Sequence, residues 1–131
     1  MIYIDSSVVL AHLLAELRRP PEHLWAESLV ASRLLEYEVW NHLHARGRAE
    51  THGEAAEEAI GQIALLELSP VILTRALSAF PAPVRTLDAL HLASLDYLRG
   101  QRQAVELATY DRRMTAVARA MGIPVLDLGR A

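Results

Sequence analysis

The chain opens with a short apolar run that is followed at once by polar residues. Ile2-Tyr3-Ile4 is β-prone and stops at Asp5-Ser6-Ser7, after which the residues from Val8 to Leu17 are mostly apolar. The apolar stretch is typical of a buried helix, and the polar corner before it supplies side chains that helix starts prefer. The sequence therefore begins with a predicted strand, an acidic corner and a helix.

Helical and extended patterns continue to alternate along the rest of the chain. Pro20 and Pro21 end the first helix, and Gly47 and Gly100 close two later ones. The further predicted elements, in chain order, are a helix over 22–29, a strand over 29–31, a helix from its cap Ser32 to residue 46, a helix over 51–63, a strand over 65–68, a helix over 70–80, a long helix between its cap Thr86 and Gly100, a strand over 105–108, a helix over 112–121 and a strand over 125–126.

This alternation of strands and helices predicts the fold class. Strands joined through helices form a mainly parallel sheet with helices on both faces, so we expect one α/β domain over residues 1–131 with three layers, α/β/α. Ligand sites in such sheets lie beyond the carboxyl ends of the strands. Asp5 and Asp111 each follow a predicted strand and are expected at that edge.

Composition narrows the setting in which the protein works. At 131 residues and 52% hydrophobic, the chain can bury a substantial core. Its apolar runs are shorter than the roughly 18 residues of a membrane span, and its first residues do not resemble a secretory signal. We therefore expect a cytoplasmic protein without a membrane segment.

The charged residues exclude several classes of enzyme. The net charge is −3, which argues against a dedicated nucleic-acid coat protein but allows an enzyme with a local cationic rim. All thirteen basic residues are arginine, so the chain has no lysine for a Schiff base, a P-loop or a receiver-type phosphoacceptor site. It also has no cysteine, so that carboxylates or histidines must hold any metal, and carboxylates favour Mg²⁺ or Mn²⁺.

Four acidic residues stand out by their positions. Asp5 and Asp111 follow strands, Asp88 lies in the first turn of a capped helix, and Glu38 lies within a helical apolar stripe. Singly, each aspartate also fits a turn, a cap or a dipole partner. Glu38 is costly to bury without a cation or strong hydrogen-bond donors. The stripe around it consists of Leu34, Leu35, Val39 and Leu43.

Together the four acids predict a metal site. Two come from carboxyl ends of strands and two from helices that would cover the same sheet edge. Clustered carboxylates repel one another unless a divalent cation neutralises them, and a bound Mg²⁺ activates water and binds phosphate oxygens. The pattern therefore favours metal-dependent phosphodiester hydrolysis.

The sequence resembles the PIN-domain nucleases along nearly its whole length. Four segments carry the resemblance: Ile2-Tyr3-Ile4-Asp5-Ser6-Ser7, Ser32-Arg33-Leu34-Leu35-Glu36-Tyr37-Glu38-Val39-Trp40-Asn41, Leu87-Asp88-Ala89-Leu90-His91-Leu92-Ala93 and Ala108-Thr109-Tyr110-Asp111-Arg112-Arg113-Met114. The resemblance implies a PIN-like fold and an acidic quartet, which binds one or two Mg²⁺ or Mn²⁺ ions. The quartet consists of Asp5, Glu38, Asp88 and Asp111. The short length is similar to VapC-type toxins, which implies an RNA substrate and an antitoxin partner.

Several polar neighbours of the acids are candidates for supporting roles. Ser6, Ser7 and Thr109 carry hydroxyls that either orient metal-bound water or cap helices, and Asn41 follows Glu38 by one turn. Arg112 and Arg113 are candidates for phosphate contacts, although arginines near a helix start are commonly just solvated. His91, one turn after Asp88, is interpreted as a hydrogen-bonded packing residue rather than a ligand.

The apolar residues of the first helices and of the Glu38 helix exceed what one core needs. This surplus predicts a homodimer and a groove for an antitoxin segment, whose arginine would enter the acidic pocket. The residues that motivate this prediction are Leu13, Leu14, Leu24, Trp25 and Trp40. The alternative to an enzyme is a non-catalytic PIN-like module that binds RNA or protein, and the intact acidic quartet favours the enzyme.

Overall fold

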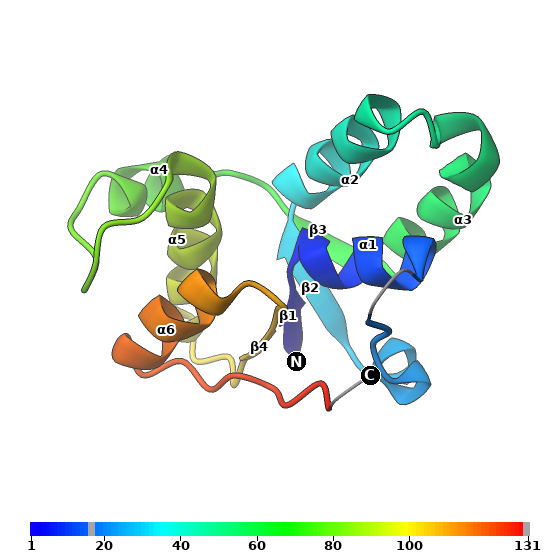
Figure 1. Ribbon diagram of the computed structural model, residues 1–131. Coiled ribbons are helices and arrows are strands. Elements are labelled where there is room, and N and C mark those ends of the chain that lie inside the picture. The colour runs from blue at the N-terminus through cyan, green and yellow to red at the C-terminus, as the bar shows by residue number, and fades with distance from the viewer. Residues whose placement is uncertain (16–17, 130–131) are drawn as a thin grey trace.

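The computed structural model describes residues 1–15 and 18–129 and contains a four-stranded parallel sheet (Figure 1). The strands are β1 (Ile2–Ile4), β2 (Leu29–Ser32), β3 (Ile63–Leu66) and β4 (Glu106–Ala108). Their order across the sheet is β3-β2-β1-β4. β1 occupies an interior position, where Ile2 pairs with Leu29 on one side and Glu106 on the other. All four strands therefore end at the same edge of the sheet.

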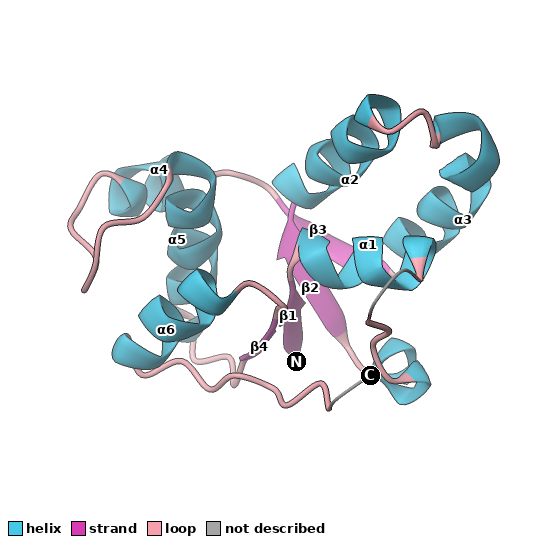
Figure 2. Ribbon diagram, in the orientation of Figure 1, coloured by secondary structure: helices cyan, strands magenta, loops and turns pink. Residues whose placement is uncertain are grey.

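Helices cover both faces of this sheet (Figure 2). One group lies on the side of α1 and the other on the side of α5 in Figure 1. The first group is α1 (Ser6–Leu14), α2 (Leu34–Ala45) and α3 (Ala49–Gly61), and the second is α4 (Pro70–Ala76), α5 (Thr86–Gly100) and α6 (Arg112–Ala120). None of the helices in the described ranges is long and apolar enough to cross a membrane.

Alternation along the strands divides the buried residues into two cores. Ile2 and Ile4 pack with α1, α2 and α3, whereas Tyr3 between them packs with α5 and α6. In β2, Val30 likewise belongs to the second core. Successive side chains of a strand point to opposite faces, so both faces of the sheet are buried. The predicted three-layer α/β/α fold is confirmed.

Several predicted boundaries differ from the observed ones because tertiary pairing decides them. The strand predicted over 65–68 begins at Ile63, where it pairs with Leu29 of β2. The helix predicted over 22–29 is a short 3₁₀ helix (Glu22–Ala26), since β2 starts at Leu29. The helix predicted over 70–80 ends at residue 76, and the last predicted strand is a single bridge between Leu107 and Val125.

Two helix starts and one helix end also differ from expectation by a few residues. Thr86 is the first helical residue of α5 and Arg85 is its cap, whereas Ser32 ends β2 and its Oγ accepts a hydrogen bond from the Leu34 N–H at 3.2 Å. α1 ends at Leu14, before the expected end at residue 17, because Ala15 adopts a left-handed conformation with φ of 49°. Residues 16 and 17 of that prediction lie outside the described residues.

Candidate active site at the carboxyl ends of the strands

Asp5 lies between β1 and α1 and is held by hydroxyl groups. Its carboxyl group is buried, with 6% of the residue exposed. The Oδ2 atom accepts hydrogen bonds from Ser7 Oγ at 2.6 Å and from Thr109 Oγ1 at 2.8 Å. Two charge-assisted hydrogen bonds offset the free-energy cost of burying the Asp5 carboxylate. The position of Asp5 is therefore fixed by both strand ends, β1 and β4.

The same hydroxyls also bind the backbone of the segment that follows β4. Ser7 Oγ accepts from the Tyr110 N–H and Thr109 Oγ1 accepts from the Asp111 N–H, each at 3.0 Å. Each hydroxyl therefore donates to Asp5 and accepts from an amide, which links the carboxylate to the backbone after β4. Ser6 is half-buried at the start of α1, and the contact with Asp5 is made by Ser7.

Asp111 combines a position near Asp5 with a structural task. It is the N-cap of α6, and its Oδ1 accepts from the N–H groups of Arg113 at 2.9 Å and Met114 at 3.3 Å. Capping of this kind satisfies amides that have no partner within the helix. Because the cap uses Oδ1, the Oδ2 atom remains available for another ligand.

The negative charges of Asp5 and Asp111 act on the carboxyl group of Asp88. It lies in the first turn of α5 and is half-buried. Burial raises the pKa of Asp88 above its ordinary value, and the negative charges of Asp111 and Asp5 raise it further. Carboxylates influence one another in this way only over short distances. The three acids are far apart in the sequence but lie within electrostatic range of one another.

The fourth predicted acid, Glu38, forms a hydrogen bond with the buried side chain of His91. Glu38 Oε1 lies 2.6 Å from His91 Nε2, and the other ring nitrogen, Nδ1, lies 2.8 Å from the Tyr3 hydroxyl. Burial alone would lower the pKa of His91, but the hydrogen bond with Glu38 and the charges of Glu38, Asp5 and Asp88 outweigh it, and the pKa is raised. Three of the four predicted acids therefore contribute to the raised pKa of His91, and Glu38 forms a hydrogen bond with it. The interpretation of His91 as a hydrogen-bonded buried residue fits this geometry.

The donor chemistry fits a hard cation, although the side chains are not gathered around one. Within residues 1–15 and 18–129, no three histidine, aspartate or glutamate side chains are placed so that they could already hold a metal ion. One oxygen each of Asp5, Asp111 and Glu38 is engaged by a hydroxyl, an amide or His91. Carboxylate oxygens are the donors that hard divalent cations prefer.

Cationic side chains flank the acids on two sides. A cavity of 270 Å³ beside Asp88 is lined in part by Arg85 and Arg113. A cavity of 180 Å³ beside Ser7 is lined in part by Arg18 and Arg46, and the Arg18 guanidinium lies 4.5 Å from the centre of the Tyr110 ring. These arginines place positive charge in cavities beside Ser7 and Asp88.

Two of the predicted supporting residues occupy exposed positions. Arg112 is exposed at the first position of α6, while its neighbour Arg113 lines the cavity beside Asp88. Asn41 is exposed on α2, one turn after Glu38. The positions of Arg112 and Asn41 do not establish a contact with the acids, so the roles of both residues stay predictions.

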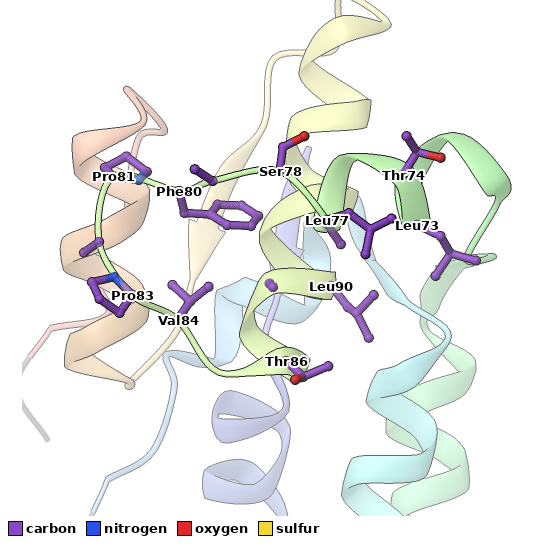
Figure 3. Close-up of a pocket in the computed structure, with 14 residues that line it drawn as sticks. Leu73, Thr74, Leu77, Ser78, Phe80, Pro81, Pro83, Val84, Thr86 and Leu90 are labelled. Atoms are coloured by element: carbon purple, nitrogen blue, oxygen red, sulfur yellow. The ribbon is translucent and has the colours of Figure 1, made fainter.

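A large apolar pocket lies between α4 and α5 (Figure 3). Its volume is 820 Å³. Leu77, Phe80, Val84 and Leu90 surround the hollow, and 88% of Leu77 is exposed. No ionisable side chain lines this pocket within the described part of the chain. It is therefore a surface suited to apolar contacts with another chain.

The apolar surplus predicted for the first helices is wrong in its location. Leu24 is in the core, and the other motivating residues are half-buried and pack against it: Leu13, Leu14, Trp25 and Trp40. The exposed large apolar residues outside the terminus are instead Tyr37, Val71, Leu73, Leu77 and Leu87. The prediction failed because helical periodicity does not reveal which of several apolar faces the sheet and α3 already cover.

Sequence reasoning did not identify Tyr3 as part of the site. Tyr3 was assigned only to a β-prone run, yet its hydroxyl reaches His91 across 88 positions of sequence. The available signal was the polar tip of an aromatic residue in a strand predicted to be buried on both faces, since a buried tyrosine hydroxyl needs a partner.

Comparisons with known proteins place this geometry in a family. The model of the PIN domain matches residues 2–120. Ribonuclease VapC46 of Mycobacterium tuberculosis is 32% identical over 134 residues, which cover 95% of each chain, and ribonuclease VapC35 of the same species is 27% identical over 138 residues, which cover 100% of this chain and 99% of the relative.

Two solved structures have the same fold. A toxin-antitoxin complex from Klebsiella pneumoniae aligns with a TM-score of 0.69 at 19% identity, and the Mycobacterium tuberculosis toxin VapC20, described as cleaving the sarcin-ricin loop, aligns with a TM-score of 0.67 at 18% identity. Both alignments cover the whole of each chain. With the family match over most of its length and the VapC relatives, the chain belongs to the PIN-domain family and is of the VapC type.

Proposed function

We propose that this protein is a metal-dependent endoribonuclease that hydrolyses phosphodiester bonds of RNA, and that it is the toxin of a type II toxin-antitoxin pair. The observation that carries the proposal is the pair of hydrogen bonds by which Thr109 Oγ1 donates to Asp5 at 2.8 Å and accepts from the Asp111 N–H at 3.0 Å, so that two of the acids lie beside one hydroxyl at the carboxyl ends of β1 and β4. The raised pKa of Asp88, to which the charges of Asp111 and Asp5 contribute after burial, supports the same grouping. A folded protein keeps such repulsive neighbours when a cation or a reaction uses them. The names of the VapC relatives, which are ribonucleases, support the same activity.

The proposed cofactor is Mg²⁺, with Mn²⁺ as a substitute, in one or two ions. Asp5, Glu38, Asp88 and Asp111 would hold it. A bound ion of this type activates a water molecule for attack on phosphorus and stabilises the charge that develops on the phosphate. Ser7 and Thr109 keep Asp5 oriented through its Oδ2 atom. The raised pKa of Asp88 would fall when a cation binds, because the cation favours the ionised carboxyl group.

The proposed substrate is RNA whose backbone crosses the two arginine-lined cavities. Arg85 and Arg113 on one side and Arg18 and Arg46 on the other would contact phosphates, while the acids between them act on the scissile bond. Arg112, Asn41 and Ser6 are proposed as further contacts at the edge of this path.

The proposed protein partners are an antitoxin and a second copy of the chain. An antitoxin arginine would occupy the acidic site in place of the cation, because guanidinium groups bind carboxylates with paired hydrogen bonds. The second copy would cover the apolar pocket between α4 and α5.

We propose that residues 1–131 form a single PIN domain and that the protein works in the cytoplasm, where its RNA substrate would be found.

The proposed activity is tested by Asp5→Asn. The amide keeps the size of the side chain and can still accept hydrogen bonds from Ser7 and Thr109, but it removes the charge that would hold the cation. We expect cleavage of a labelled RNA in Mg²⁺ to fall at least about 100-fold, with the far-ultraviolet circular dichroism unchanged. The matched control is Asp127→Asn, which alters an exposed aspartate that accepts a hydrogen bond from the Gly129 N–H.

The comparison separates the enzyme from the non-catalytic module. Loss of RNA cleavage in Asp5→Asn, with cleavage retained in Asp127→Asn, supports the proposal that the protein is an enzyme. Equal Mg²⁺-dependent cleavage by wild type and Asp5→Asn, in preparations free of other nucleases, contradicts the proposed mechanism. RNA binding without cleavage by the wild type would support the binding module instead.

A further inference from the structure

A chain of hydrogen bonds runs from the centre of the sheet to Glu38. The backbone N–H of Ser32 donates to the Tyr3 hydroxyl at 3.1 Å, the hydroxyl meets His91 Nδ1 at 2.8 Å, and His91 Nε2 meets Glu38 Oε1 at 2.6 Å. Tyr3 is fully buried, and 1% of His91 is exposed. The chain therefore links β2, β1, α5 and α2 without access for solvent at its two inner members.

Glu38 fixes the direction of one hydrogen bond in this chain. An ionised carboxylate only accepts, so His91 Nε2 donates to Glu38. In the neutral imidazole Nδ1 then accepts from the Tyr3 hydroxyl, whereas in the protonated imidazole Nδ1 donates to the Tyr3 oxygen. With Nδ1 as acceptor, a neutral imidazole carries its proton on Nε2 and donates it to Glu38. A protonated imidazole also donates from Nε2. In both states Glu38 receives a hydrogen bond at the same oxygen.

Glu38 differs from Asp5 and Asp111 in how it is supported. Asp5 and Asp111 cap helices, and their carboxylates accept from hydroxyls or from amides of the first helical turn. Glu38 lies five positions into α2, on a longer side chain, and its described hydrogen bond comes from His91. A flexible glutamate held at one oxygen presents its second oxygen in a restricted orientation.

We infer that His91 and Tyr3 are positioning residues that orient Glu38 toward the acidic site and so raise its affinity for a divalent cation. This inference rests on the proposed metal-dependent function. Neither residue touches the cation or the substrate in this scheme, and their effect passes through the carboxylate of Glu38. Ser32 contributes with its backbone only, so its side chain is not required.

Two substitutions of His91 separate the parts of the chain. In His91→Gln the amide nitrogen lies near the place of Nε2 and can still donate to Glu38. In His91→Asn the shorter amide lies near the place of Nδ1, so the hydrogen bond to Glu38 is lost. Substitution of a residue that orients a metal ligand typically lowers the affinity for the metal about 10-fold to 100-fold. For His91→Asn we expect Mn²⁺ to bind at least about 10-fold more weakly, and for His91→Gln within about 3-fold of wild type.

The measurement is calorimetric titration of the full-length, metal-free protein with Mn²⁺ in the absence of RNA. Arg75→Gln serves as the control because it breaks a different ion pair to α5, between Arg75 Nε and Asp96 Oδ2 at 2.9 Å. We expect this control to bind Mn²⁺ like the wild type. A second arm places His91→Asn in a Glu38→Gln background, where it should have no further effect on Mn²⁺ affinity.

Each outcome decides the inference. Weaker binding by His91→Asn, restored by His91→Gln and absent in the Glu38→Gln background, supports it. Equal Mn²⁺ affinity of wild type and folded His91→Asn overturns it while leaving the proposed function intact. Absence of Mn²⁺ binding by the wild type overturns both. If His91→Asn does not fold, Tyr3→Phe decides: a several-fold loss of Mn²⁺ affinity supports the inference, and unchanged affinity overturns it.

Discussion

At the scale of single residues, His91 makes the stability of the metal-free protein depend on pH. Its pKa in the folded state is raised, since the Glu38 hydrogen bond and the surrounding negative charges outweigh its burial. A histidine whose pKa is higher in the folded than in the unfolded state stabilises the fold when protonated. This stabilisation is fully present below the unfolded pKa near 6.5 and is lost as pH rises through the folded pKa.

The expected result is a difference between wild type and His91→Gln that shrinks as pH rises. Urea unfolding across the range from weakly acidic to weakly alkaline pH would measure the free energy of unfolding of both proteins. The comparison is needed because His12 acts in the opposite direction: burial and then the charge of Arg19 lower its pKa. A constant difference between the two proteins at every pH would show that His91 does not change its protonation with a raised pKa.

At the scale of elements, three helices begin at the acids. Asp5 caps α1, Asp111 caps α6, and Asp88 lies in the first turn of α5. The amino end of a helix carries a partial positive charge, which favours carboxylates placed there. The helix starts therefore offset part of the repulsion among the three aspartates, so the fold can hold them together before any cation binds.

Asp111 allows the capping and site functions to be separated. Asp111→Asn keeps an acceptor for the N–H groups of Arg113 and Met114, whereas Asp111→Ala removes it. We expect both variants to lose cleavage about 100-fold, while only Asp111→Ala loses about 1 kcal/mol of unfolding free energy. Cleavage assays and urea unfolding of the two variants would measure this.

The control for this experiment is a cap that lies far from the acids in the sequence. Ser69 caps α4 and its Oγ accepts from the Ile72 N–H at 3.4 Å. Ser69→Ala should lower the free energy of unfolding without changing cleavage in Mg²⁺. Equal stability of Asp111→Ala and Asp111→Asn would mean that the cap of α6 contributes little.

The elements also show what the sequence could predict. Ile2-Tyr3-Ile4 followed by Asp5 was enough to place an acid at a strand end, because the signal is local. The start of β3 at Ile63 was not predictable in this way, since it depends on pairing with Leu29 of β2. The contact of Tyr3 with His91 joins residues 88 positions apart, so no spacing within either motif indicates it.

At the scale of the whole molecule, the apolar pocket adjoins the cavity beside Asp88, because Pro83 and Val84 line both. The pocket between α4 and α5 has a volume of 820 Å³ and a protruding side chain, Leu77, at its edge. A two-fold interface brings the same patch of both copies together, so a protruding apolar side chain of one copy can enter the hollow of the other.

Leu77→Glu tests the proposed homodimer. A charge at a position that two copies would bury is costly to desolvate, so we expect the variant to be a monomer under conditions where the wild type is a dimer. Light scattering coupled to size exclusion over a range of protein concentrations would measure the mass. Ala116→Glu, an exposed position on α6, is the matched control and should leave the dimer intact. A wild type that stays monomeric, or a Leu77→Glu variant that dimerises as tightly as the wild type, would exclude this interface.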